Sequence, residues 1–232
     1  MRALLLPVKD LRHAKQRLAP FLNAAERLGL VQAMLADTVR AIRGVRQAEK
    51  IFVVTNYIPA MEAAEQNGWD LLREDRQISE SFSVDYASVQ CAKRGVTSLL
   101  RLPLDVPLVQ SSDIDELLAV ECAAPGLVIV PSRDGTGTNA ILRTPPSLFP
   151  SHFGSGSFAN HCAEAQRVDA HILIRRNARL EMDVDDETDL RVLVQQDLSG
   201  TETGVWLQNS GLMARLRQPN IVDKSVARAA TL

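Results

Sequence analysis

Two aspartates separated by one residue, Asp183 and Asp185, are the clearest candidates for chemistry in this 232-residue sequence. Alternate side chains of an extended chain point to the same side, so the two carboxylates would face one ligand together. Paired carboxylate oxygens are ligands that a hard cation such as Mg²⁺ prefers. The neighbouring acids Asp186, Glu187 and Asp189 have another explanation, because acidic residues are favoured in the first turn of a helix. The stretch therefore predicts a metal pair followed directly by a helix.

A third aspartate, Asp105, stands between two prolines in the segment RLPLDVPLV, where an apolar run ends. Pro103 and Pro107 restrict the backbone on both sides of it. A lone aspartate at a strand end is often a helix cap, but the next helix has its own candidate cap in Ser111 or Ser112. We therefore expect Asp105 to be free to bind a ligand and to complete a three-carboxylate metal site.

Basic side chains crowd the segment after the first apolar run, where Lys9, Arg12, Lys15 and Arg17 fall within nine residues. On a loop, such a group suits a polyphosphate, because lysine and arginine both bind phosphate oxygens. The alternative is the solvated basic face of a helix. We favour phosphate binding, because the segment follows a strand and should lie at the edge of the sheet where ligands bind.

Two loops rich in glycine and hydroxyl side chains are candidates for anion binding. The first, PSRDGTGTNAIL, offers backbone N–H groups at Gly135 and Gly137 and side-chain donors at Thr136, Thr138 and Asn139. The second, HFGSGSFANH, precedes an expected helix, and backbone amides at a helix start bind anions readily. A tight polar turn and a flexible surface loop are the respective alternatives.

The elements that would position these residues alternate along the chain. Short apolar runs predict strands at ALLLPV, KIFVVT, DLLRE, SLLRLP, GLVIVP and HILIRR, and helical spacing predicts helices between them, most clearly over 23–43. This order indicates an α/β fold with a mixed, mainly parallel sheet and helices on both faces. Ligands of such sheets bind at the carboxyl ends of the strands, and the candidate residues follow those ends.

Composition excludes several classes of protein. The net charge is −2 and the isoelectric point about 6.1, so a dominant nucleic-acid footprint is absent. No apolar run approaches the roughly 18 residues of a membrane span, and the first residues read as a strand rather than a signal peptide. Three scattered cysteines fit neither a disulfide framework nor a zinc motif, which predicts a cytoplasmic protein. We expect one domain over 1–217 and, over 218–232, a loose tail or an oligomer contact.

In order along the chain, PVKDLRHAKQRL, LPLDVPLV, PSRDGTGTNAIL, FGSGSFANH and MDVDDETDL resemble the signature regions of the guanylyltransferases that make the deazaflavin coenzyme F-420. The resemblance runs from about Leu6 to Leu190 and is carried mainly by the two glycine loops together. It implies a single Rossmann-like domain of the GT-A nucleotidyltransferase type. It also implies that the phosphate of a small phosphorylated acid attacks the α-phosphorus of GTP, with pyrophosphate as the leaving group.

The resemblance also assigns roles to individual residues. Two Mg²⁺ ions would be held by Asp105, Asp183 and Asp185. The triphosphate would face Lys9, Lys15 and Arg17, and the carboxylate of the phospho-acid would be held by Thr136, Gly154 and Ser157, with Thr138. The implied partners are GTP, the phosphorylated acid and a downstream deazaflavin transferase that receives the labile product. Neither nucleic acid nor a membrane is expected, and a homodimer is left open.

One segment departs from the family. Where many members read approximately Gly-Leu-Asn before the third helix, this chain reads SESFSVDYA, which leaves the base contacts and the acid preference open. Its hydroxyl groups suit a hydroxylated acid, and its SVD form is similar to that of bacterial members that accept 3-phospho-D-glycerate. This acid is therefore slightly favoured over phosphoenolpyruvate and 2-phospho-L-lactate.

Two other functions stay open at this point. One is a nucleotidyltransferase of the same fold with another acceptor, such as a molybdopterin or a sugar phosphate. It predicts different loops in place of DGTGTN and FGSGSF. The other is a non-catalytic nucleotide-binding module, which predicts loss of the metal aspartates, whereas all three are present here.

Overall fold

The computed structural model describes residues 1–74, 76 and 78–217, and the predicted tail over 218–232 lies outside the described residues. The strands are β1 (Arg2–Val8), β2 (Lys50–Thr55), β3 (Asp70–Leu72), β4 (Ser98–Arg101), β5 (Gly126–Pro131), β6 (Thr138–Thr144) and β7 (His171–Ile174). The α-helices are α1 (Ala24–Arg43), α2 (Ile58–Gln66), α3 (Glu80–Lys93), α4 (Ser111–Ala119), α5 (Ser157–Arg167), α6 (Glu187–Leu193), α7 (Glu202–Asn209) and α8 (Leu212–Arg217). Short 3₁₀ helices occupy Leu11–His13 and Gln16–Leu18.

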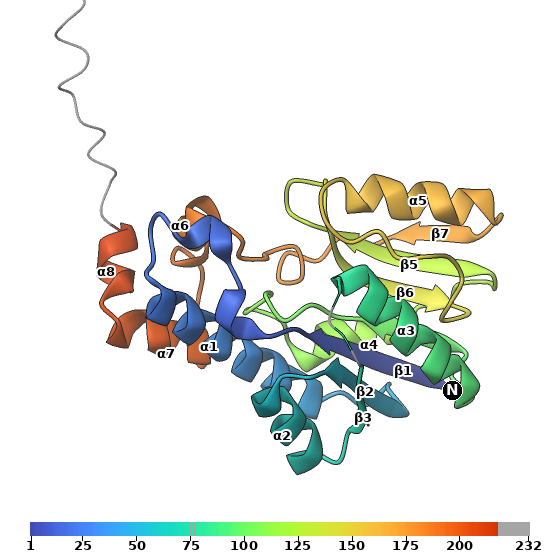
Figure 1. Cartoon of the computed structure of the whole chain (residues 1–232). Helices are drawn as coiled ribbons and strands as arrows, with labels where there is room; N and C mark the ends of the chain where they lie inside the picture. Colours follow the sequence, from blue (N-terminus) through green and yellow to red (C-terminus); the bar gives the residue numbers. More distant parts are fainter. Residues whose placement is uncertain (75, 77, 218–232) are drawn as a thin grey trace, which may run out of the picture.

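A seven-stranded sheet lies at the centre of the molecule, in the order β3-β2-β1-β4-β6-β5-β7 (Figure 1). β1 is parallel to β2 and β4, β2 to β3, and β5 to β7. β6 is antiparallel to both of its neighbours, β4 and β5. Within this sheet, therefore, β6 alone runs against the other strands. The predicted mixed, mainly parallel α/β sheet is confirmed.

β6 is a strand that was not predicted, because PSRDGTGTNAIL was interpreted as one polar loop after the preceding strand. The chain turns back directly after β5, and the turn is closed by a hydrogen bond of 3.0 Å from the Ser132 N–H to the Gly137 carbonyl. Since β6 runs antiparallel to β4 and β5, its first residues lie at the edge of the sheet where β4 and β5 end. This reversal brings Thr138 and Asn139 to the ligand edge of the sheet.

Helices cover both faces of the sheet, as predicted (Figure 1). Neighbouring residues of β1 point to opposite faces, so Leu5 joins the core under α3 whereas Leu4 and Leu6 join the core under α1. α5 packs on the same face as α3, over β5 and β7. The opposite face, which α1, α2 and α4 cover, holds the largest core, and α7 packs against α1.

Capping residues set the start of the helices that flank the ligand edge. At α1, the Asn23 side chain accepts from the Glu26 N–H at 3.0 Å and the Glu26 carboxylate accepts from the Asn23 N–H at 2.7 Å, so the predicted cap is confirmed. At α4 the predicted serine cap is wrong. Gln110 occupies the cap position, because it and Asp113 form the reciprocal side-chain and backbone pair, and Ser111 is already helical.

α7 packs against α1 and is hydrogen-bonded to it. The buried carboxylate of Asp37 on α1 accepts from the N–H groups of Glu202 and Thr203 at 2.7 and 2.9 Å, at the start of α7. Gly29 lets the ring of Trp206 approach, because a Cβ there would lie 2.4 Å from the indole nitrogen. Among the described residues, none of the helices has the length and hydropathy that a bilayer span requires.

Candidate active site

Two adjoining cavities lie at the carboxyl edge of the sheet. The basic cavity, about 460 Å³, is lined by most of residues 7–17 together with residues that follow β3 and β4. The loop cavity, about 630 Å³, is lined by the loops around 132–139 and 153–157 and by the acidic stretch 183–189. Six residues line both cavities: Arg17, Glu80, Arg101, Pro103, Asp105 and Asp185. The two cavities therefore form one continuous cleft.

All ten residues predicted for the site line this cleft. On the side of the basic cavity are Lys9 and Lys15, at the boundary are Arg17, Asp105 and Asp185, and on the side of the loop cavity are Asp183, Thr136, Thr138, Gly154 and Ser157. They come from segments as far apart as 9 and 185 in the sequence. The sheet brings them together because its parallel strands end at one edge.

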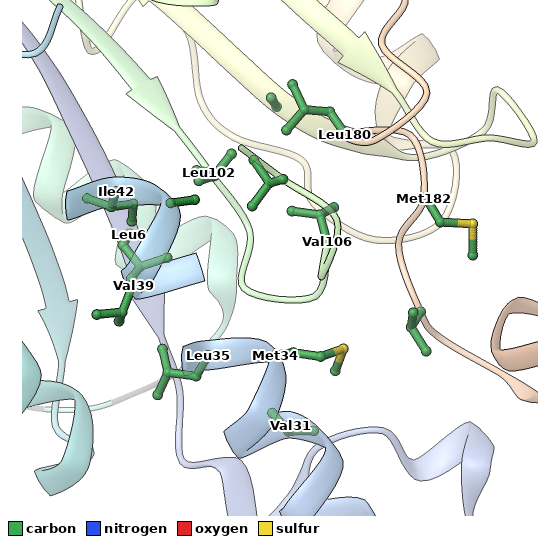
Figure 2. Close-up of a cluster of buried hydrophobic side chains, with 14 of the residues drawn as sticks. Leu6, Val31, Met34, Leu35, Val39, Ile42, Leu102, Val106, Leu180 and Met182 are labelled. Carbon is green, nitrogen blue, oxygen red and sulfur yellow. The ribbon is translucent and has the colours of Figure 1, made fainter. Parts of the chain in front are cut away.

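A backbone hydrogen bond joins the two aspartate segments. The Val184 N–H donates to the Asp105 carbonyl at 3.1 Å, so Asp183 and Asp185 flank the third aspartate. Val184 is fully buried, and its neighbours on either side are directed toward the cleft. Both segments rest on the main core, where Leu102 and Val106 lie near Leu180 and Met182 (Figure 2).

The acidic stretch was expected to follow directly from a strand. In the structure it does not. β7 ends at Ile174, and a turn over 177–182 intervenes before Asp183. The Asn139 side chain of β6 donates to the Leu180 carbonyl at 2.8 Å and fixes this turn against the sheet. The helix that follows is as predicted: Asp186 is the cap of α6, and Glu187 and Asp189 lie in its first turn.

A lysine ammonium lies between two of the three carboxylates. The Nζ of Lys15 is 2.6 Å from Asp105 Oδ2 and 2.7 Å from Asp185 Oδ1, and the lysine side chain is only 9% exposed. Burial disfavours the charged lysine, but the two carboxylates outweigh burial, so the pKa of Lys15 is raised. The residue has φ 53° and ψ 46°, a left-handed conformation that costs an L-residue roughly 1 kcal/mol. The two ion pairs hold it there.

The third carboxylate, Asp183, forms no ion pair within the part of the chain that the structure describes. Burial is the main reason that its pKa is raised to about 6, and the charges of Asp105 and Asp185 add to the shift. Asp105 shows the opposite result, because Lys15 more than offsets burial and the pKa of Asp105 is lowered. An additional cation near Asp183 would therefore relieve an unfavourable negative charge.

The donor set of these aspartates fits a hard cation, because carboxylate oxygens are the ligands that Mg²⁺ takes in proteins. Within the described ranges, no three acidic, histidine or cysteine side chains are gathered closely enough to hold a metal as they stand. Lys15 instead supplies the positive charge between Asp105 and Asp185. A metal at the three aspartates thus requires the ammonium to move.

The other basic residues of the first segment differ in exposure and in whether they line the basic cavity. Arg17 is 70% exposed and lies 3.6 Å from Asp185 Oδ2. Lys9 is exposed at the wall of the basic cavity, and partial desolvation lowers its pKa although the charge of Glu74 acts the other way. Arg12 pairs with Asp10 at 2.5 Å and does not line the basic cavity. The segment therefore directs Lys9, Lys15 and Arg17 into the cleft.

A buried histidine fixes the donor direction of Thr138. The His152 N–H donates to Nε2 of His161 at 2.9 Å, so the ring proton is on Nδ1, which lies 3.0 Å from Thr138 Oγ1. Burial, with Arg143 and Arg101 nearby, lowers the pKa of His161 to about 3, so the ring stays neutral. Because Nδ1–H donates to the threonine oxygen, the Thr138 hydroxyl proton is left for an acceptor in the loop cavity.

The start of α5 faces the loop cavity. Gly154 and Gly156 have φ values of 122° and 69°, which favour glycine, and Gly156 offers no side chain to cap the helix. The N–H groups of Ser157 and Phe158 already donate to the Gly154 and Thr136 carbonyls, at 3.2 and 3.1 Å, so it is the helix dipole that favours an anion there. Ser157 is buried at this end. Thr136 is less available than predicted, because its hydroxyl lies 2.9 Å from the carboxylate of Asp134.

The segment that departs from the family is the start of α3, one turn earlier than predicted. Ser79 caps the helix, and its side chain accepts from the Phe82 N–H. Ser81 accepts from the Phe153 N–H at 2.9 Å, and Asp85 accepts from the Ser151 N–H at 3.0 Å. The segment thus holds the loop that leads into α5.

The hydroxyl groups of this segment do not line the loop cavity. Ser79 and Ser81 line neither cavity, and Ser83 lines the basic cavity. They therefore give no reason of their own to favour a hydroxylated acid.

Arg101, the last residue of β4, is a residue of the cleft that was not predicted from the sequence. It is 6% exposed, lines both cavities and lies with its guanidinium 4.3 Å from the Phe153 ring centre. It forms an ion pair with Glu80, while its buried Nε has no hydrogen-bond partner among the residues that the structure describes. Burial lowers its pKa to about 10, so it stays charged at neutral pH. The signal was an arginine inside the apolar run SLLRLP, because a charge there is rarely buried without a role.

The family comparison agrees with this site. The family described as guanylyl transferase CofC like matches residues 1–228. This chain belongs to that family. The resemblance inferred from the signature regions is confirmed, and so is the enzyme class, a nucleotidyltransferase.

Curated relatives carry two substrate names. The chain is 35% identical over 189 residues to a phosphoenolpyruvate guanylyltransferase of Rubrobacter xylanophilus, covering 80% of this chain and 89% of the relative. It is 36% identical to the enzyme of the same name from Roseiflexus castenholzii, covering 83% and 87%. A 2-phospho-L-lactate guanylyltransferase of Methanothermobacter thermautotrophicus is 29% identical, covering 82% of each.

Solved structures show the same fold at low identity. A Desulfovibrio desulfuricans protein described as a nucleotide-diphospho-sugar transferase matches with a TM-score of 0.75 and 15% identity, over 92% of this chain and 96% of that one. A cytidylyltransferase from Leptospira borgpetersenii matches with a TM-score of 0.55 and 12% identity, over 94% and 98%. The fold implied by the resemblance is thus confirmed.

Proposed function

We propose that this protein transfers the guanylyl group of GTP to the phosphate of a small phosphorylated carboxylic acid and releases pyrophosphate. One observation carries the proposal: a single cleft has cations at one end, three aspartates at its centre and an anion-binding pair of loops at the other end. The printed names of the relatives, phosphoenolpyruvate and 2-phospho-L-lactate guanylyltransferases, support it.

The reaction makes limited demands on proton chemistry. The attacking phosphate oxygen is already an anion, so no general base is needed. The difficulty is that two anions must approach each other, and catalysis rests on neutralising and aligning them. Lys9, Lys15 and Arg17 bind the triphosphate in the basic cavity. Pyrophosphate then forms among these cations as the bond to the α-phosphorus breaks.

Asp105, Asp183 and Asp185 would hold Mg²⁺, as two ions in our proposal. Bound metal would neutralise charge on the phosphate groups. Lys15 has two roles in sequence: it balances Asp105 and Asp185 before substrate arrives, and it then turns to the phosphates. Its strained backbone supports such an exchange, in which the two ion pairs to Asp105 and Asp185 are given up.

The phospho-acid occupies the loop cavity. Its carboxylate accepts from the Thr138 hydroxyl and lies next to Gly154 and Ser157 at the start of α5, where the helix dipole favours negative charge. Thr136 lies beside this position and contributes through its loop rather than its hydroxyl, which Asp134 holds. Arg101, at the boundary of both cavities, binds the phosphate that attacks GTP. Its unpartnered Nε and its place between the cavities support this role.

The finer identity of the substrate remains part of the proposal. Phosphoenolpyruvate and 2-phospho-L-lactate are the acids in the names of the relatives, and 3-phospho-D-glycerate is a third candidate from the SVD resemblance. We place the reaction in the cytoplasm and in deazaflavin coenzyme F-420 biosynthesis. A downstream transferase would take up the labile product.

Pyrophosphate release tests the reaction. The protein is incubated with GTP, Mg²⁺ and each of the three acids in turn, with the downstream transferase and its deazaflavin acceptor present to trap product. Release that depends on one acid supports the proposal and names the substrate. If folded protein that binds GTP releases no pyrophosphate with any of the three acids, the acid class is refuted and another acceptor, such as a sugar phosphate, is indicated.

A further inference from the structure

Glu74 is a buried carboxylate that the reaction described above does not use. It lies two residues beyond β3, is 6% exposed and lines the basic cavity. Its Oε1 is buried and, among the described residues, lacks a hydrogen-bond partner. Such an atom is costly, because burial removes water from a charged acceptor without replacing its hydrogen bonds.

The rest of Glu74 is held firmly. The Ser83 hydroxyl of α3 donates to Oε2 at 2.7 Å, and the Asn56 side chain, just after β2, donates to the Glu74 carbonyl at 2.5 Å. Ser83 thus orients the carboxylate, and Asn56 holds the backbone that carries it. Lys9 is the nearby cation in electrostatic terms, but the ion pairs of the described residues include none between Lys9 and Glu74. The open oxygen is therefore not explained by a fixed ionic partner.

We propose that Glu74 reads the guanine base of GTP. This inference rests on the proposed function and adds the residue that selects the nucleotide. The Watson–Crick edge of guanine carries two adjacent donors, N1–H and the N2 amino group. An ionised carboxylate only accepts, so it pairs with both. Adenine has a lone pair at N1, which faces the carboxylate unfavourably.

The place of Glu74 in the sheet suits a base. β3 is separated from β1 by β2, and neighbouring strands lie about 5 Å apart, so Glu74 stands roughly 10 Å across the sheet from the basic segment. That is the order of the distance between the phosphates of a nucleotide and its base. The triphosphate therefore lies at the end of β1 while the base reaches the end of β3.

Xanthosine triphosphate provides the sharpest test, because xanthine carries a carbonyl where guanine carries the N2 amino group. A carboxylate rejects that carbonyl, whereas a glutamine amide donates to it and still accepts from N1–H. Binding of GTP and xanthosine triphosphate is titrated by calorimetry with Mg²⁺ for wild type and Glu74→Gln. The matched control is Glu62→Gln, the same change at an exposed glutamate of α2 that lines neither cavity.

The expected result is a reversal of base preference confined to Glu74→Gln. Wild type and Glu62→Gln prefer GTP by roughly 100-fold, and Glu74→Gln loses about 10- to 100-fold in GTP affinity while its affinity for xanthosine triphosphate rises. An unchanged preference in Glu74→Gln would overturn the inference and leave the proposed function standing. If the wild-type protein bound no GTP at all, the proposed function itself would be refuted.

A second measurement needs no variant, should Glu74→Gln fail to fold. Wild type is titrated with 1-methylguanosine triphosphate, whose N1 cannot donate. Loss of binding by at least tenfold relative to GTP supports a carboxylate on that edge. Equal binding would contradict it.

Discussion

The two halves of the cleft differ in how firmly their binding groups are held. In the loop cavity, Thr138 is bonded to a neutral buried histidine, Asn139 is bonded to the turn before Asp183, and the loop before α5 is bonded to α3. In the basic cavity, Arg17 is 70% exposed and Lys15 is strained and paired with carboxylates. We therefore expect the loop cavity to be arranged in advance and Lys15 and Arg17 in the basic cavity to rearrange when their ligand arrives.

This difference follows from what each ligand brings. A small acid carries few groups, so its site must be built beforehand to bind it in one orientation. A triphosphate carries several negative charges and, with metal, alters the charge balance of the whole cleft. Lys15 keeps two aspartates neutralised until then, which avoids a cluster of unpaired buried charges.

The largest effect is expected at the aspartates between the halves. Asp183→Asn should lower turnover by at least about 100-fold, because the cleft loses a charged oxygen ligand. It should not lower the melting temperature at pH 7.5, since burial already opposes the ionised form of Asp183. Pyrophosphate release and thermal unfolding measure the two properties.

Asp105→Asn is the comparison variant, because it removes a partner of the buried Lys15 ammonium and should destabilise the fold as well as stop turnover. Equal destabilisation by both variants would break the assignment of Asp183 as the aspartate without a cation.

The next effect concerns the balancing lysine. Lys15→Met should raise the GTP concentration needed for half-maximal rate more than that of the acid. Without the ammonium, Asp105 and Asp185 repel each other, so Mg²⁺ alone should raise the melting temperature more in Lys15→Met than in wild type. Thermal unfolding with and without Mg²⁺ checks this. A smaller metal effect in the variant would mean that Lys15 does not compete for the aspartates.

A smaller effect is expected in the prearranged half. Thr138→Val should raise the KM of the acid by roughly tenfold, the value of one hydrogen bond to a charged group, with little change for GTP. Thr144→Val, at the other end of β6, is the matched control, because the Thr144 hydroxyl bonds to Ser98 away from the cleft. Steady-state kinetics with each substrate varied distinguishes them. A change in the KM of GTP alone would mean that Thr138 does not contact the acid in the loop cavity.

The smallest effect concerns His161 and pH. Its pKa is about 3 in the folded protein and near 6.5 when unfolded, so the unfolded chain binds more protons between these values. This term therefore lowers the free energy of unfolding as pH falls, by about 1 kcal/mol from pH 8 to pH 6.

Urea unfolding of wild type and His161→Gln at both pH values measures that term, which the variant should lack. The raised pKa of Asp183 acts with the opposite sign, since there the folded state binds more protons between 3.8 and about 6. That contribution is common to both proteins and cancels in the difference. Parallel pH profiles would show that His161 is not held neutral.

The sequence was most informative where local pattern and chemistry coincide. Continuous apolar runs predicted six of the strands, and aspartates at the ends of such runs predicted residues that the structure brings together. β6 escaped prediction because its strand character depends on pairing with β4 and β5. The same limit applies to Arg101, Glu74 and His161, whose importance rests on burial and partners distant in sequence.

The hydrogen bond from the Val184 N–H to the Asp105 carbonyl has a consequence for how this enzyme can diverge. The spacing of its central aspartates depends on main-chain atoms, which nineteen of the twenty amino acids share. Apolar residues of similar size can therefore replace Val184 without changing the spacing of the aspartates. Proline is the exception, because it has no N–H to donate. Val184→Pro would separate the two segments while every aspartate remained in the sequence.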